Sequence, residues 1–273
     1  MGTLYLVATP IGNLQDITLR ALDILRAVPL IAAEDTRSAR RLLDHFGVSA
    51  RLTSYNEHNA RARTPLLLDA LAAGDVAVVS DAGMPGISDP GHHLVVAAAE
   101  AGHAVVPIPG ASAVVAAVAA SGLPSRRFHY LGFLPRHSGP RRAALRAAAA
   151  SGDTIVIFES PHRLQQTLTD VLVALGDRRV AACRELTKLY EEVWRGSVSG
   201  ALEHFAEPRG EFTLVIEGGP PAAVNRASTS ADIGETIAEL RAAGTPSREA
   251  VAQLMLRCGL ARRVAYAAWH RGV

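Results

Sequence analysis

Residues 76–91 read VAVVSDAGMPGISDPG, a short apolar run followed at once by a loop rich in glycine and proline. Four apolar residues bounded by turn residues are typical of a buried strand. The loop from Asp81 to Gly91 contains three glycines and two prolines, which let backbone amides and carbonyls approach a ligand closely. It matches neither G-x-G-x-x-G nor the P-loop pattern, so dinucleotide and P-loop sites are not indicated. Composition alone leaves an ordinary connecting loop as an equally good interpretation.

Strands alternate with helices on both sides of this stretch. Further strands are predicted at residues 4–8, 30–33 and 104–108. Thr18 is expected to cap the first helix, and Asp89 with Pro90 to open the helix after the glycine-proline loop. A second loop, PIPGASA at residues 107–113, is spaced as if it followed an adjacent parallel strand. Both loops are therefore expected at the same carboxyl edge of a mostly parallel, covered sheet.

The second half of the chain predicts another α/β unit and a helical extension. PRHSGP at residues 135–140 resembles a linker, and strands are predicted at 154–158, 180–184, 191–196 (antiparallel) and 212–217. Residues 141–150 and 161–175 are expected to be helical. The predicted domains are 1–122, 123–220 and a basic helical extension at 225–273. The fold class is therefore α/β, with two α/β domains followed by a small helical extension.

The composition limits the chemistry. The chain has 273 residues and a formal net charge of +2, too little to indicate a nucleic-acid protein by itself. Lys188 is the single lysine, so a mechanism that needs two lysines is excluded within one chain. Cys183 and Cys258 belong to no metal-binding spacing, which predicts reduced thiols and no metal site. The uncharged stretch 104–123 is interrupted by prolines and glycine. With no signal-peptide pattern, we expect a cytoplasmic protein outside the membrane.

Three polar clusters follow predicted strands: EDTR at 34–37, SYNEHN at 54–59 and FESPHR at 158–163. Carboxylates and a histidine at strand ends are candidates for proton transfer. The catalytic candidates are Asp35, Glu57, His58 and Glu159. A structural alternative stays open, in which Asp35 or Thr36 caps a helix and the other charges form ion pairs. Ser160 and Pro161 are likewise an ordinary helix start.

These residues together resemble the tetrapyrrole methylase superfamily and, within it, the ribosomal RNA small-subunit methyltransferase branch. The motifs that carry the resemblance run in order over residues 4–218 and read LYLVATPIGNLQDIT, AAEDTRSARRLL, SYNEHN, VVSDAGMPGISDPG, PIPGASA, FESPHR, CRELTKLYEE and GEFTLVIEG. The arginine-rich C-terminal helices resemble the extension of that branch less specifically.

The resemblance implies a homodimer with S-adenosyl-L-methionine in a cleft between the two α/β domains. It also implies methyl transfer to the ribose 2′-oxygen of a cytidine in the decoding region of 16S ribosomal RNA, the partner being this RNA or the 30S particle. Cofactor contacts carried over by motif are Pro10, Ala82, Gly83, Met84, Ile87, Ser112, Ala113, Phe158, Leu186, Thr213 and Leu214.

A ribose hydroxyl is a poor nucleophile, so one of the four catalytic candidates is expected to take its proton. Candidate RNA contacts are Arg37, Arg163, Arg248, Arg262 and Arg263. Two other functions stay open at this point. One is methylation of a precorrin or a diphthamide intermediate by the same fold, and the other is a non-catalytic RNA-binding assembly factor.

Overall fold

The computed structural model describes residues 2–219, 230–258 and 262–271. By its internal contacts the chain divides into two compact units. One comprises residues 1–148 and 153–218 and holds both sheets, and the other comprises 149–152 and 219–273. The further division of the first unit at residue 122 stays a prediction.

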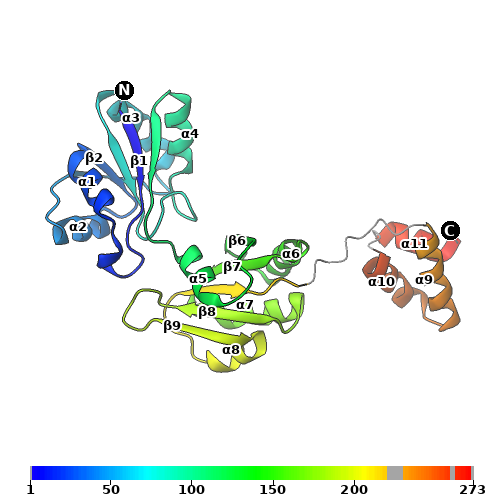
Figure 1. Ribbon diagram of the computed structural model, residues 1–273. Coiled ribbons are helices and arrows are strands. Elements are labelled where there is room, and N and C mark those ends of the chain that lie inside the picture. The colour runs from blue at the N-terminus through cyan, green and yellow to red at the C-terminus, as the bar shows by residue number, and fades with distance from the viewer. Residues whose placement is uncertain (1, 220–229, 259–261, 272–273) are drawn as a thin grey trace. The chain divides into compact units, whose positions relative to one another are not determined.

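The first sheet is parallel throughout, as predicted (Figure 1). Its strands are β1 (Thr3–Val7), β2 (Leu30–Ala33), β3 (Arg51–Ser54), β4 (Val76–Val79) and β5 (Ala104–Ile108), in the order β3-β2-β4-β1-β5. One expectation is wrong: β4 and β5 are not adjacent, because β1 pairs with both. The two glycine-containing loops therefore flank the end of β1 at the carboxyl edge of the sheet.

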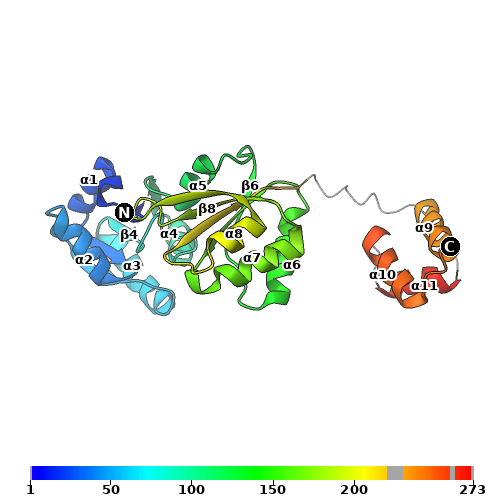
Figure 2. The same ribbon diagram turned by 90° about the horizontal axis from the view of Figure 1, so that it is seen from below.

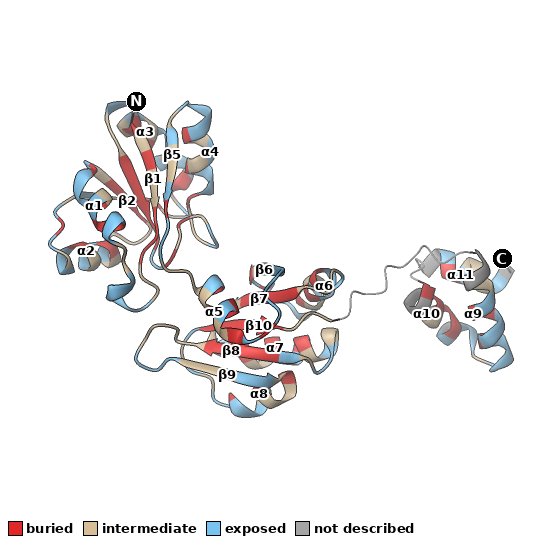
Figure 3. Cartoon of the chain, viewed as in Figure 1, coloured by how far each residue is buried: buried red, intermediate tan, exposed pale blue. Residues whose placement is uncertain are grey.

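Helices cover both faces of this sheet because its strands are apolar on both sides. One core joins α1 (Leu19–Ala27) and α2 (Thr36–His45) to strand residues such as Val7, and the other joins α3 (Ala60–Ala73) and α4 (His92–Glu100) to residues such as Leu4. Figure 3 shows β2 as largely buried, whereas β5 at the edge of the sheet is mostly exposed or intermediate.

The helix starts follow the predictions in part. Thr18 caps α1 as expected, since its hydroxyl accepts a hydrogen bond from the Ala21 amide at 3.1 Å. The predicted start at Asp89 and Pro90 is wrong, because α4 begins at His92 after Gly91. Gly91 has a φ of 152°, which favours glycine, and it occupies the N-cap position that was predicted for Asp89.

The second sheet is mixed and has the order β6-β7-β10-β8-β9. Its strands are β6 (Phe128–Phe133), β7 (Thr154–Glu159), β8 (Arg179–Arg184), β9 (Glu192–Ser197) and β10 (Phe212–Ile216). The antiparallel strand predicted at 191–196 is confirmed as β9, whereas β6 was not predicted. The expected linker at 135–140 is only partly correct, because α6 (Ser138–Ala149) begins inside it.

The helix α5 (Ala113–Ser121) follows the last strand of the first sheet but packs against the second. Val114, Ala117 and Val118 join a core with second-sheet residues that include Val156 and Val215. The helices α7 (Pro161–Leu175) and α8 (Val198–His204) also belong to the part of the chain that holds the second sheet. The short 3-10 helix η1 (Leu14–Asp16) belongs to the part that holds the first sheet. The N-terminus of α5 is thereby fixed at the place where the two sheets meet.

The C-terminal helices have a core of their own. α9 (Ser230–Ala242), α10 (Ser247–Cys258) and α11 (Arg262–Arg271) pack through residues such as Leu240, Leu254 and Ala265 (Figure 2). Cys183 and Cys258 are buried and belong to no disulfide, in agreement with the expectation of reduced thiols. Among the described residues, no helix has the length and apolar character needed to cross a bilayer, and no group of side chains is arranged to hold a metal ion.

A buried ion pair attaches α6 to α7. The Asp170 carboxylate accepts hydrogen bonds from the Arg141 guanidinium at 2.6 Å and from the Ser138 hydroxyl at 2.8 Å, and both charged side chains are 3% exposed. Burial alone would raise the pKa of Asp170, but hydrogen bonds from Ser138, Arg142 and Arg141 outweigh it and lower the pKa.

Replacing Asp170 by alanine should lower the free energy of unfolding by about 3–5 kcal/mol, because a buried guanidinium is left without its partner. The difference from wild type should shrink as the pH falls towards the lowered pKa of Asp170. Chemical denaturation measures both effects. Asp23→Ala is the control, since its exposed pair with Arg26 at 3.6 Å should contribute about 0.5 kcal/mol or less. A loss for Asp170→Ala as small as that of the control would contradict the assignment.

Candidate active site

The ends of three strands in the first sheet are joined at Ala8 and Thr9. Its amide donates to the Gly83 carbonyl at 2.9 Å, and the Gly83 amide donates back to the Thr9 carbonyl at 3.0 Å. The buried Thr9 hydroxyl donates to the Ser80 carbonyl at 3.1 Å, and the Ala8 amide donates to the Ile108 carbonyl at 3.1 Å. The loop after β1, the loop after β4 and the end of β5 therefore form one hydrogen-bonded platform.

Two glycines make this platform possible. Gly83 has a φ of 81°, a conformation that costs other residues free energy. A Cβ on Gly110 would lie 2.9 Å from the Cβ of Ala8, so a larger residue would push the β5 loop away from β1. These two glycines thus allow the backbones of neighbouring loops to approach each other closely.

A pocket of about 480 Å³, here called the main pocket, lies over this platform. It is within the size range of small-molecule sites, and loops of both sheets line it. Most of the cofactor residues predicted from the resemblance lie in its wall, namely Ala82, Gly83, Met84, Ile87, Ser112, Ala113, Phe158, Leu186 and Thr213. Pro10 lines a different pocket, and Leu214 is fully buried within β10.

The wall of the main pocket is strongly acidic, which motif matching alone did not predict. Its carboxylates are Glu34, Asp81, Asp89, Glu159, Glu185 and Glu211, and Lys188 is the one cation among the described residues that line it. Lys188 donates to Glu211 at 2.7 Å and to Glu185 at 3.0 Å. These bonds outweigh burial and raise the pKa of Lys188, so it stays protonated and cannot accept a proton.

Three of the carboxylates gather where the first sheet meets the pocket. Burial raises the pKa of Asp89 to about 6, and the nearby charge of Glu34 acts in the same direction. Burial also raises the pKa of Glu34, although the Asp81 amide donates to this carboxylate at 3.2 Å. The two aspartates could be read from the glycine-proline loop in the sequence, but their closeness to Glu34 follows only from the fold.

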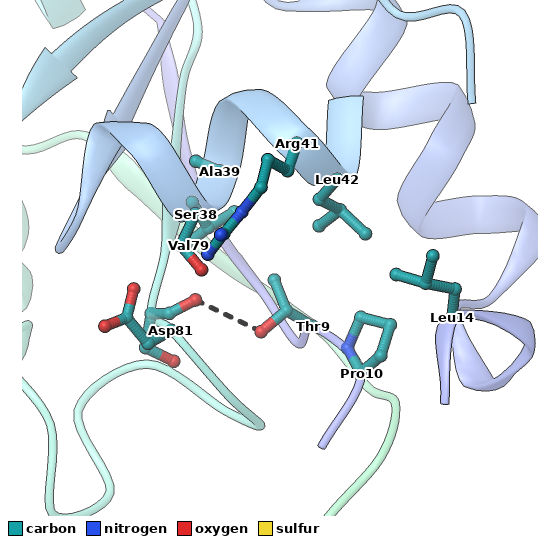
Figure 4. Close-up of a pocket in the computed structure, with 10 residues that line it drawn as sticks. Thr9, Pro10, Leu14, Ser38, Ala39, Arg41, Leu42, Val79 and Asp81 are labelled. Atoms are coloured by element: carbon teal, nitrogen blue, oxygen red, sulfur yellow. Dashed lines mark hydrogen bonds between the residues drawn. The ribbon is translucent and has the colours of Figure 1, made fainter. Parts of the chain in front are cut away.

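A smaller pocket of about 310 Å³, the side pocket, opens between the β1 loop, α2 and the end of β4 (Figure 4). Its wall combines apolar and polar side chains and consists of Thr9, Pro10, Leu14, Ser38, Ala39, Arg41, Leu42, Val79, Ser80 and Asp81.

The EDTR cluster at 34–37 divides between two roles. Glu34 lines the main pocket, whereas Asp35 caps α2 and lines neither pocket. The Asp35 carboxylate accepts from the Arg37 amide at 2.8 Å and from the Arg37 guanidinium at 2.7 Å, and these bonds lower its pKa to about 2. The structural alternative for Asp35 and Arg37 therefore accounts for the contacts observed.

The SYNEHN cluster forms a turn after β3, away from both pocket walls. Glu57 and His58 are exposed, and the His58 amide donates to the Asn56 side chain at 3.1 Å. Neither side chain belongs to the lining of either pocket.

In the FESPHR cluster, Glu159 lies in the main pocket wall but is 2% exposed. Its carboxylate accepts from the Ser160 amide at 2.8 Å and from the Thr167 hydroxyl at 2.6 Å, with the Arg163 guanidinium 3.6 Å away. Arg163 also donates to the Leu134 carbonyl at 2.7 Å. These contacts hold the start of α7 in place. The side chains of Arg248, Arg262 and Arg263 lie outside the described residues.

Comparisons of this chain with known protein families and solved structures agree with this architecture. Residues 3–201 match the family model of Tetrapyrrole (Corrin/Porphyrin) Methylases. A uroporphyrin-III C-methyl transferase from Thermus thermophilus, solved with S-adenyl homocysteine, superposes with a TM-score of 0.58 at 19% identity. The superposition covers 79% of this chain and 97% of that one. Such a low identity shows a shared fold only. The fold and the match together define a methyltransferase of the tetrapyrrole methylase class.

Two curated relatives narrow the assignment. A ribosomal RNA small subunit methyltransferase I from Halalkalibacterium halodurans is 47% identical over 99% of this chain and 95% of its own length. Another, from Synechocystis sp., is 48% identical over 97% of this chain and 96% of its own. The chain belongs to this ribosomal RNA small subunit methyltransferase I family.

One contact joins the glycine-proline loop to the second sheet. The hydroxyls of Ser88 and Tyr130 are 2.6 Å apart, and Ser88 has a φ of 61°, which is uncommon for a residue with a side chain. A Cβ on Gly132 would lie 2.9 Å from the Ser88 hydroxyl, so Gly132 leaves room for this contact.

Replacing Tyr130 by phenylalanine should loosen the loop without unfolding the sheets. A hydrogen bond worth about 1 kcal/mol corresponds to roughly fivefold faster amide exchange at residues that open locally. Hydrogen exchange measured by mass spectrometry should show this change in peptides that cover 84–91. Tyr190→Phe is the control, since Tyr190 is 69% exposed and outside both pocket walls. Equal exchange in both variants would show that the contact does not hold the loop.

Proposed function

We propose that this protein uses S-adenosyl-L-methionine to methylate the ribose 2′-hydroxyl of a cytidine in the decoding region of 16S ribosomal RNA. The observation that carries the proposal is the main pocket, whose wall contains nine residues carried over as cofactor contacts. The two curated relatives, whose names specify small-subunit ribosomal RNA, support the choice of substrate.

The main pocket suits S-adenosyl-L-methionine in size, surface and charge. Its volume of about 480 Å³ fits a nucleoside-sized ligand, and Phe158, Leu186 and Met84 offer apolar surface to an adenosine ring. The molecule carries a sulfonium and an ammonium group. The carboxylates that converge from Glu34, Asp81 and Asp89 favour such a cation by Coulomb attraction.

When bound, the cofactor supplies an activated methyl group, so the residues of this chain have to orient the acceptor, exclude water and accept a proton. A lysine base is unsuitable, because Lys188 is held by Glu185 and Glu211. Among the predicted bases, Glu159 is the one in the pocket wall, but serine and threonine hydrogen bonds occupy both its oxygens. Asp35, Glu57 and His58 line neither pocket.

The tetrapyrrole and diphthamide alternatives have weaker support. The uroporphyrin enzyme shares the fold at 19% identity, whereas the ribosomal RNA relatives share 47% and 48%. The homodimer, the cytoplasmic location and the 30S particle as substrate stay predictions, as do the RNA contacts of Arg37, Arg163, Arg248, Arg262 and Arg263.

Deleting the gene should remove one ribose methyl group from small-subunit ribosomal RNA. Mass-spectrometric mapping of RNA from deletion and wild-type cells locates the missing group, and purified protein with S-adenosyl-L-methionine should restore it on isolated small subunits. An unchanged RNA methylation pattern would refute the proposal. Transfer of labelled methyl to tetrapyrrole precursors in a parallel assay would instead favour that alternative.

Binding of S-adenosyl-L-methionine should weaken as the pH falls from 7 to 5. Burial raises the pKa of Asp89 to about 6, so protonation removes its charge within this interval. The affinity should fall by up to about tenfold for each unit by which the bound cation lowers that pKa. Calorimetry should find a smaller effect for S-adenosylhomocysteine, which lacks the sulfonium charge. Asp89→Asn should flatten the pH dependence, whereas Asp23→Asn on α1 should not. A wild-type dependence retained in Asp89→Asn would exclude Asp89 as its source.

A further inference from the structure

The side pocket has the chemistry of a nucleotide site and is separate from the main pocket. Pro10, Leu14 and Leu42 give it an apolar wall on which a flat ring can pack. Its volume of about 310 Å³ is at the lower end of the range for ligand sites. A single nucleotide is a ligand of this class, whereas a tetrapyrrole is much larger.

Arg41 provides a cation at this pocket. It projects from α2 towards the loop that carries Ser80 and Asp81, as Figure 4 shows. No hydrogen bond or ion pair to another described residue occupies its guanidinium, in contrast to Arg37, which is paired with Asp35 at 2.7 Å. A free guanidinium beside an apolar wall is suited to bidentate contact with a phosphate.

Asp81 connects the two sites. Among the described residues, it is the one that lines both the side pocket and the main pocket. Its amide is held by the Glu34 carboxylate at 3.2 Å, and the neighbouring Ser80 carbonyl is held by the Thr9 hydroxyl at 3.1 Å. The backbone that carries this carboxylate is therefore fixed between the two cavities.

We propose that the side pocket receives the acceptor nucleotide, with Arg41 on its phosphate and Asp81 as the group that takes the proton of its ribose 2′-hydroxyl. This assignment rests on the proposed function. It places the donor in the main pocket, the acceptor in the side pocket, and the base at the wall they share. A nucleotide unstacked from its neighbours could enter such a site, since sequence-specific RNA recognition commonly uses splayed bases.

The reaction balances with these groups alone. The ribose oxygen attacks the methyl carbon of the donor, and its O–H bond breaks as the new O–C bond forms. The C–S bond breaks, and its electron pair stays on sulfur, which becomes a neutral thioether. The proton passes to the Asp81 carboxylate. No oxidant, metal ion or further reactant is required.

The electrostatic surroundings suit this role. Partial burial raises the pKa of Asp81 and the charge of Asp35 acts in the same direction, while the Asp35 backbone amide, Arg37 and Arg41 lower this pKa. Glu34 and Asp89 are the other charged groups close to this carboxylate. Arg37 and Arg41 favour the ionised carboxylate of Asp81, while its partial desolvation raises its basicity as a proton acceptor.

Single-turnover methyl transfer to small subunits from cells that lack this protein tests the proposal, with S-adenosyl-L-methionine at saturation. Asp81→Asn should lower the rate by about 100-fold or more, in the range of lost general-base catalysis. The rate of the wild-type protein should fall in acid as Asp81 becomes protonated, and this acid limb should be absent in Asp81→Asn. A purely structural role would leave the acid limb in place.

Arg41→Gln should raise the particle concentration for half-maximal rate by about tenfold or more, without a change in cofactor affinity. Arg40→Gln is the matched control, because Arg40 is the exposed neighbour on α2 and lines neither pocket. Leu14→Trp is a second and independent variant. It fills the side pocket and should impair methyl transfer while cofactor binding, measured by calorimetry, is retained.

The outcomes separate the two proposals. If wild-type protein methylates the particles but Arg41→Gln and Leu14→Trp behave like Arg40→Gln, the side pocket is not the acceptor site. If Asp81→Asn keeps the wild-type rate and acid limb, Asp81 is not the base. If wild-type protein transfers no methyl to ribose in the particles, the proposed function itself fails.

Discussion

The reciprocal hydrogen bonds between Thr9 and Gly83 are the constraint on which the site depends. They join the ends of β1 and β4 at a point where neither strand continues. Backbone groups paired in this way are satisfied without water, so the two loops can be partly buried beside a ligand cavity. Because the Thr9 hydroxyl also binds the Ser80 carbonyl, the direction of the chain into Asp81 is fixed. The main pocket and the side pocket lie on either side of this junction.

The sequence predicted the strands well where local signals were strong. The runs at 30–33, 76–79 and 104–108 are strands with those bounds, because continuous apolar residues between turn signals have few alternatives. β6 was missed because FHYLGF contains a histidine and a glycine and reads poorly as a buried strand. The start expected at Asp89 and Pro90 was wrong for a tertiary reason. Burial of Asp89 beside Glu34 and Ser80 prevails over its local tendency to cap a helix.

Residues of the candidate site could be predicted from the sequence where the backbone of a loop forms the pocket wall. Ala82, Gly83 and Ser112 lie in the main pocket wall because motif and loop position are nearly the same information. The roles of the polar clusters were harder to predict, since a carboxylate that follows a strand can cap a helix, form an ion pair or face a cavity. Asp35 caps, Glu34 faces the cavity, and they are neighbours in sequence. Which of these roles a carboxylate takes depends on the order of the strands in the sheet. Local sequence spacing carries no information about that order.

The packing of α5 has a consequence for cooperativity. This helix leaves the first sheet at Ser112, which lines the main pocket, yet its apolar face belongs to the core of the second sheet. A fragment cut at residue 122 would carry Val114, Ala117 and Val118 without the strands that cover them. It would also leave the second sheet without one of its covering helices. The two halves therefore share one stretch of hydrophobic core, and they should melt as a single folding unit despite having separate sheets.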